Sequence, residues 1–157
     1  MTAWKYILLG IILGSALVVI RYFPNDYNEA HTEKLCQKIT GRQDSLPVVI
    51  ELSKIQFSVD GSFAIHYHAT VFECFLENPA KFFDAATRNS QVEALLAKEF
   101  EIGLASYRDW HGQMPVNWRN RVMALIPNLE NKRGANPRLF QEIEDWAKKT
   151  LSENPES

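Results

Sequence analysis

The sequence has little net charge, and no segment of it concentrates basic residues. Its 17 lysines and arginines are balanced by 19 aspartates and glutamates, which gives a formal net charge of −2. A chain of this balance has no overall attraction to nucleic acid or to anionic lipid. We therefore expect no nucleic-acid partner. The apolar share of 46% and the charged share of 23% are those of an ordinary globular protein.

The sequence also lacks the short motifs that mark most catalytic and cofactor sites. It contains no G-x-S-x-G, P-loop, G-x-G-x-x-G, H-E-x-x-H or C-x-x-C pattern. Its nearest approach to a metal site is His66-Tyr67-His68, since residues two apart on a strand share one face. Such a pair needs a third ligand, for which His31, His111 or Glu73 are candidates. A half-exposed polar strand face explains the His66-Tyr67-His68 pattern better than a metal site does. We therefore expect no metal, no cofactor and no catalytic residue. His66 and His68 are weak metal candidates.

Cysteine is scarce, with Cys36 and Cys74 as its two positions. An even pair in a domain outside the cytoplasm favours one disulfide. A bridge closing a loop of about 38 residues would contribute roughly 3–4 kcal/mol in the chain-entropy model. The alternative is a pair of buried free thiols.

Long apolar runs are absent except for one, residues 7–20, which carries no charged side chain. Trp4 and Phe23 lie beyond its two ends, and a helix between them would reach about 30 Å, enough to span a bilayer. We predict a transmembrane anchor. A cleaved signal peptide fits less well, because the best small-x-small triplet would leave apolar residues at the new N-terminus. A buried soluble helix is the third alternative.

The flanking charges favour an N-terminus in the cytoplasm and a C-terminal domain outside it, in the periplasm if the source is bacterial. Within the run, Gly10 and Gly14 lie four apart and would let a partner helix approach closely. We therefore predict that these glycines bind a partner through one face of the membrane helix. The expected partners are other membrane or envelope proteins, together with the lipid bilayer.

The middle of the chain predicts a juxtamembrane helix followed by a β-hairpin. Residues 28–43 carry a thin apolar stripe at helical spacing. Residues 46–59 and 63–75 are rich in β-branched and aromatic residues that largely alternate, which indicates two strands. Asp60-Gly61 marks the turn. A bulge near Ser53-Lys54 would keep the apolar positions of the first strand on one face.

The second half of the chain predicts helices. Asn78-Pro79 and Asn136-Pro137 each place a capping residue before a proline, and residues 90–93 form a capping box. Residues 99–106 also alternate, so a third strand is the alternative there. Pro115 opens a helix that closes before Pro127, and residues 131–136 form a loop.

Together these features predict an α+β fold with a single N-terminal transmembrane helix and one antiparallel hairpin packed against several helices. The predicted boundaries are residues 1–24 for the anchor, 25–45 for the juxtamembrane helix, 46–151 for the extracytoplasmic domain and 152–157 for a disordered tail. The predicted function is that of a non-catalytic accessory or assembly subunit of an envelope complex. The alternatives are a membrane-anchored inhibitor or immunity-type protein, and a small metal-dependent periplasmic hydrolase.

Overall fold

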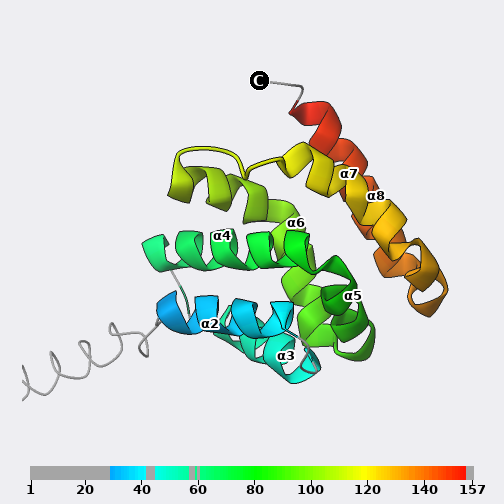
Figure 1. The fold of residues 1–157 in the computed structure, drawn as a ribbon, viewed down its shortest axis with the longest axis horizontal. Coiled ribbons are helices and arrows are strands. Elements are labelled where there is room, and N and C mark those ends of the chain that lie inside the picture. The colour runs from blue at the N-terminus through cyan, green and yellow to red at the C-terminus, as the bar shows by residue number, and fades with distance from the viewer. Residues whose placement is uncertain (1–28, 42–44, 57–58, 60, 155–157) are drawn as a thin grey trace, which may run out of the picture.

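The computed structural model describes residues 29–41, 45–56, 59 and 61–154 of the chain, and the regular elements of this part are all helices (Figure 1). Its elements are α2 (Glu29–Thr40), α3 (Leu46–Ile55), α4 (Gly61–Glu77), α5 (Pro79–Arg88), α6 (Ser90–His111), α7 (Trp118–Leu129), the 3₁₀ helix η1 (Glu130–Ala135) and α8 (Pro137–Glu153). No strand occurs among the described residues. The predicted α+β fold is therefore wrong, and the domain is all-α.

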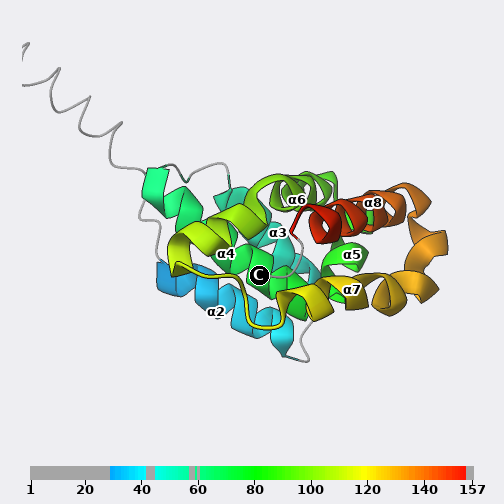
Figure 2. The same ribbon diagram turned by 90° about the horizontal axis from the view of Figure 1, so that it is seen from above.

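Helix α4 lies at the centre of the bundle. It packs most extensively on α6 and also contacts α2, α7 and α5. Figures 1 and 2 show α2 and α3 on one side of α4, and α7 and α8 as an antiparallel pair at the far end of the bundle. Six aromatic side chains that are at least 99% buried lie in the core, namely Tyr67, Phe72, Phe75, Phe82, Phe83 and Phe140.

The two predicted strands are the helices α3 and α4. In α3 the buried residues are Val49, Leu52 and Ser53, which recur at helical spacing. Helix α4 is covered by several neighbours, so its apolar and aromatic residues occupy most of its circumference. A narrow polar stripe remains, formed by His66, Thr70, Glu73 and Glu77. In such a sequence, apolar and polar residues alternate by chance, and many of the residues favour strands when considered alone. Its packing among other helices nevertheless makes the segment helical. The predicted hairpin and bulge are therefore wrong.

A glycine allows the close approach of α4 and α6. A Cβ atom placed on Gly103 would lie 2.6 Å from Cδ2 of Phe72 and 2.8 Å from Oε2 of Glu99. Real Cβ contacts are essentially never this short, so the ring of Phe72 occupies the space that a side chain at position 103 would need.

Several helices expected from local signals are present. The helix expected at 28–43 is α2, and the capping asparagine before Pro137 accepts a hydrogen bond from the Leu139 amide at 3.1 Å. The segment 99–106 is helical, so the strand alternative is wrong. Helix α6 is capped by Asn89 and not by a capping box at Ser90. Helix α7 begins at Trp118, not at Pro115 as predicted, and continues past Pro127 to Leu129. The 3₁₀ helix η1 replaces the predicted loop.

The predicted transmembrane segment, with Gly10 and Gly14, lies outside the described residues. Among the helices that the structure describes, none combines the length and the apolar character needed to cross a membrane. The longest is α6 at 22 residues, and it carries charged side chains such as Lys98, Glu101 and Arg108. This finding counts against the predicted single-pass membrane topology, the signal-anchor and the extracytoplasmic location of the domain, and we withdraw all three. The domain boundaries remain predictions.

The predicted disulfide is also wrong, because Cys36 on α2 and Cys74 on α4 are free thiols. The Cys36 thiol donates to the Thr70 carbonyl at 4.0 Å. A hydrogen bond with the Cys36 thiol, together with burial, raises the pKa of Cys74 far above its usual range. The two cysteines therefore pack as neutral thiols between α2 and α4.

Candidate functional site

His66 and His68, the weak metal candidates, lie on different sides of α4, because residues two apart on a helix are about 200° apart around its axis. The His66 ring packs edge-on against Trp110 of α6, with centroids 4.6 Å apart. His68 hydrogen-bonds through Nδ1 to Oε1 of Glu99 at 2.7 Å. The described residues contain no group of three or more His, Cys, Asp and Glu side chains placed to hold a metal ion.

The His68–Glu99 pair is a polar contact enclosed in the core between α4 and α6. The Glu99 side chain is fully buried, and burial raises the pKa of its carboxyl from 4.5 to about 7, although the hydrogen bond from His68 opposes this shift. Its Oε2 atom is buried and has no hydrogen-bond partner among the described residues. Because both side chains are buried and bonded to each other across the contact between α4 and α6, we interpret the pair as a structural contact.

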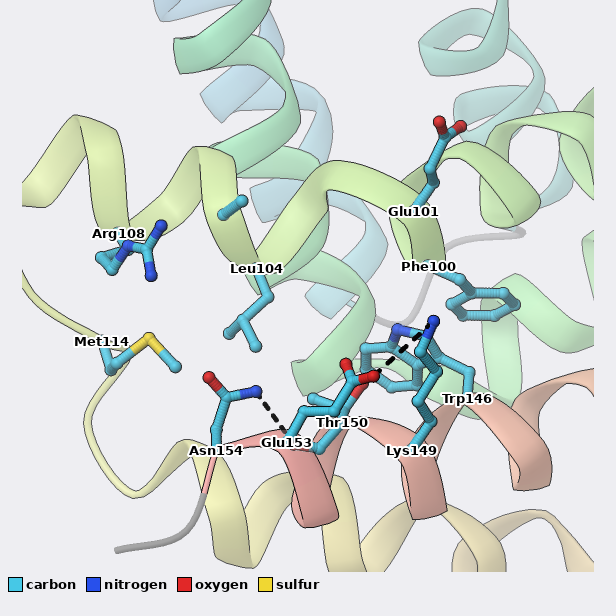
Figure 3. Close-up of a pocket in the computed structure, with 11 residues that line it drawn as sticks. Phe100, Glu101, Leu104, Arg108, Met114, Trp146, Lys149, Thr150, Glu153 and Asn154 are labelled. Atoms are coloured by element: carbon cyan, nitrogen blue, oxygen red, sulfur yellow. Dashed lines mark hydrogen bonds and ion pairs between the residues drawn. The ribbon is translucent and has the colours of Figure 1, made fainter. Parts of the chain in front are cut away.

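A groove with a volume of about 310 Å³ lies between α6 and α8. Figure 3 shows its wall on α6, its wall on α8 and the chain before α7 that closes one end. The lining residues are Phe100, Glu101, Leu104, Ala105, Arg108, Met114, Trp146, Lys149, Thr150, Glu153 and Asn154. We call this feature the α6–α8 groove.

The floor of the α6–α8 groove is apolar and is joined to the core. The rings of Phe100 and Trp146 lie 5.1 Å apart at a tilt of 30°. Behind them, Trp146 meets Phe72 edge-on at 5.9 Å and Phe100 meets Phe75 at 5.6 Å. These edge-to-face arrangements are the favourable geometry for aromatic pairs. The floor is therefore rigid, although its upper faces remain half-exposed.

Further apolar surface comes from Leu104 and Met114, which are both half-buried and point into the space between α6 and α8 (Figure 3). Phe100 and Leu104 are four residues apart on α6, and Trp146 and Thr150 are four apart on α8. Side chains at this spacing form ridges along each helix, with a groove between them.

The charged rim of the groove is internally paired. Lys149 lies 3.9 Å from Glu153 on α8. On α6, Glu101 pairs with Lys98 at 2.9 Å and Arg108 with Asp109 at 3.6 Å. Exposed pairs of this kind contribute little to stability. They do leave the rim with balanced charge and no excess of either sign.

The C-terminal wall of the groove is anchored to α7. The Arg119 guanidinium donates to the carbonyls of Leu151 and Asn154, which are among the last carbonyls of α8. Helix ends leave such carbonyls without partners inside the helix, and a cation suits the negative end of the helix dipole. Arg119 thereby fixes the end of α8 that carries Glu153 and Asn154.

No family model, curated protein or solved structure matches the chain. The chemistry of the groove must therefore be inferred from its own residues. Among the lining side chains there is no imidazole or thiol, and the hydroxyl of Thr150 belongs to a buried residue. The arrangement provides apolar contact and a polar rim, which is the layout of a binding surface.

The sequence predictions missed this groove. Phe100, Leu104 and Trp146 carry the expected helical periodicity, and such residues are ordinarily core. Their half-exposure arises because α8 packs chiefly on α7 and meets α6 only to a small extent. Only the number of tryptophans, four in 157 residues, pointed towards exposed aromatic anchors.

Proposed function

We propose that this chain is a non-catalytic protein-binding subunit, and that its α6–α8 groove receives an amphipathic helix of a partner protein. The observation that carries the proposal is the half-exposed apolar floor of Phe100, Leu104, Met114 and Trp146 between two helices that barely touch. A third helix laid along this groove would bury its apolar face against these side chains.

The size and spacing of the groove favour a helix over a small molecule. Small-molecule sites combine an apolar enclosure with a few convergent polar groups that fix the orientation of the ligand. Here the charged groups, such as Lys149 and Glu153, are paired with one another along the rim. Apolar ridges at i and i+4 match the i, i+3, i+4 and i+7 anchors of an amphipathic helix.

The enzyme alternative has no observation in its favour. His66 and His68, which a metal-dependent hydrolase would use, are buried and engaged with different partners. The inhibitor alternative is also a protein-binding role, and it would use the same kind of surface.

The test is a selection of helical peptides from a displayed random library against the full chain, followed by calorimetric titration. The proposal expects enriched peptides with apolar residues at i, i+3 or i+4, and i+7. Leu104→Glu places a charge in the groove and should weaken their binding at least about tenfold, equivalent to about 1.4 kcal/mol. Met123→Glu is the matched control, because Met123 is 51% exposed on α7 and does not line the groove.

Two outcomes would contradict the proposal. One is the absence of any enriched helical peptide. The other is a set of peptides that bind the Leu104→Glu and Met123→Glu variants equally well. Circular dichroism at 222 nm establishes that both variants keep the helical fold of the parent chain.

A further inference from the structure

The two cysteines line a cleft between α2 and α4. These two helices run side by side in both views (Figures 1 and 2), and the cleft between them has a volume of about 160 Å³. Its lining residues differ from those of the α6–α8 groove and are Glu33, Cys36, Thr70, Glu73, Cys74 and Glu77. We call this feature the thiol cleft.

The thiols of Cys36 and Cys74 are direct neighbours in the thiol cleft. Cys74 is 3% exposed, and its thiol hydrogen-bonds with the thiol of Cys36. Cys36 is half-buried and donates to the Thr70 carbonyl of α4 at 4.0 Å, which holds its sulfur against that helix. Two sulfur atoms, one from each helix, therefore converge at a point that is open to solvent through the cleft.

Three carboxylates surround these sulfur atoms at the mouth of the thiol cleft. Glu33 belongs to α2, and Glu73 and Glu77 belong to α4. The Arg121 guanidinium of α7 lies 3.6 Å from Glu73 and 3.9 Å from Glu77, so it offsets part of their negative charge. A cleft lined by charge of one sign concentrates ions of the opposite sign. The mouth therefore favours the entry of a cation over that of an anion.

The type and number of the ligands select the kind of cation. Structural Zn²⁺ sites use four ligands, and Ca²⁺ sites use six or more. Among the residues that the structure describes, no group of three or more His, Cys, Asp and Glu side chains is placed to hold a metal ion. Cysteine sulfur is the ligand of soft cations such as Cu(I), which also accepts linear coordination by two thiolates. A pair of thiols thus matches Cu(I) in both type and number.

We propose that the thiol cleft binds one Cu(I) ion between the Sγ atoms of Cys36 and Cys74. Two copper–sulfur bonds form, and each thiol releases its proton to the solvent, as metal binding by cysteine requires. Copper remains in the +1 state and no electron is transferred. The site is separate from the α6–α8 groove and does not depend on what that groove binds.

The test is a titration of the reduced full chain with Cu(I) in the absence of oxygen, in competition with the chelator bathocuproine disulfonate. The proposal expects one ion bound per chain, and an X-ray absorption spectrum with two sulfur neighbours in a linear arrangement. Cys36→Ser removes one ligand at a half-buried position and should weaken the binding at least about a hundredfold, and Cys74→Ser should do the same. Circular dichroism at 222 nm checks that each variant is folded.

Met114→Leu is the matched control, because the Met114 thioether is another sulfur ligand but lines the α6–α8 groove. Its affinity for Cu(I) should equal that of the parent chain. Three results would overturn the proposal, namely no Cu(I) retained against the chelator, equal affinity of a folded Cys36→Ser variant and the parent chain, or a copper centre with nitrogen ligands or more than two ligands.

Discussion

Replacing Gly103 by alanine should destabilise the fold, because this residue sets the distance between α4 and α6. The added Cβ atom would lie 2.6 Å from Cδ2 and 2.8 Å from Cγ of Phe72, and 2.8 Å from Oε2 of Glu99. Phe72 and Glu99 are both fully buried, so neither side chain has open space into which it can move.

The magnitude follows from two opposing terms. Overpacking a well-packed core costs about 1–3 kcal/mol, and the contact of a backbone-fixed Cβ with a buried ring places this site near the upper end. Alanine gains roughly 1 kcal/mol over glycine in helix propensity. The net loss in the free energy of unfolding is therefore about 2 kcal/mol, to be measured by urea denaturation followed at 222 nm.

Two controls make this prediction specific. Gly134→Ala should change stability by less than about 0.5 kcal/mol, because a Cβ atom there meets nothing within 4 Å. Phe72→Leu combined with Gly103→Ala should cost less than the sum of the two single changes, since leucine vacates part of the contested space. A Gly103→Ala protein as stable as the parent chain, or additive costs in the double variant, would refute the close packing described for α4 and α6.

Three further predictions concern the buried carboxyl, the cap of α6 and the two thiols. Folding raises the pKa of Glu99 from 4.5 to about 7, so the folded state holds this proton more tightly than the unfolded chain. The stability that this group contributes should be fully present below about pH 4.5 and should be lost, by up to roughly 3 kcal/mol, as the pH rises through 7 to 8; Glu99→Gln should flatten this dependence in urea melts. Asn89→Ala should lower the free energy of unfolding by about 1 kcal/mol, because the Asn89 side chain accepts hydrogen bonds from two backbone amides of α6. Ser90→Ala is the control and should lower it by less. Equal losses for the two variants would favour a capping box at Ser90 instead. Dithiothreitol should leave the melting temperature unchanged, because the two cysteines are free thiols. Iodoacetamide should modify the half-buried Cys36 faster than Cys74, whose pKa is strongly raised. An intact mass two hydrogens lighter in the absence of reductant would contradict this and show that the two cysteines form a disulfide.

The helices that the sequence predicts correctly are those with local signals at their ends. Asn136 before Pro137 and Asn78 before Pro79 mark helix starts, and the structure has helices beginning at both prolines. Helix α8 has one apolar face and one polar face, so the sequence pattern also predicts its apolar stripe. Short-range physics therefore determines most of the second half of the chain.

The central helix could not be predicted in the same way. Helix α4 is covered on several sides, and residues such as Val71, Phe72 and Phe75 favour strands when judged alone. This segment is helical because it packs against several neighbouring helices. The local sequence pattern does not indicate which elements will surround it. The error then carried over to the site, because His66 and His68 share a face on a strand but not on a helix.

The α6–α8 groove depends on tertiary arrangement even more strongly. Whether Phe100 and Trp146 are core or surface residues is decided by how far α8 lies from α6. No local pattern reports that distance.

Hydrogen exchange of the full chain with and without a selected helical peptide tests the proposed groove most directly. The proposed function predicts slower amide exchange in the segments that carry Phe100 to Arg108 and Trp146 to Glu153 when the peptide is bound. It predicts no change in the part of α7 around Met123. Protection confined to α7, or no protection along α6 and α8 at saturating peptide, would contradict the assignment of the groove as the protein-binding site.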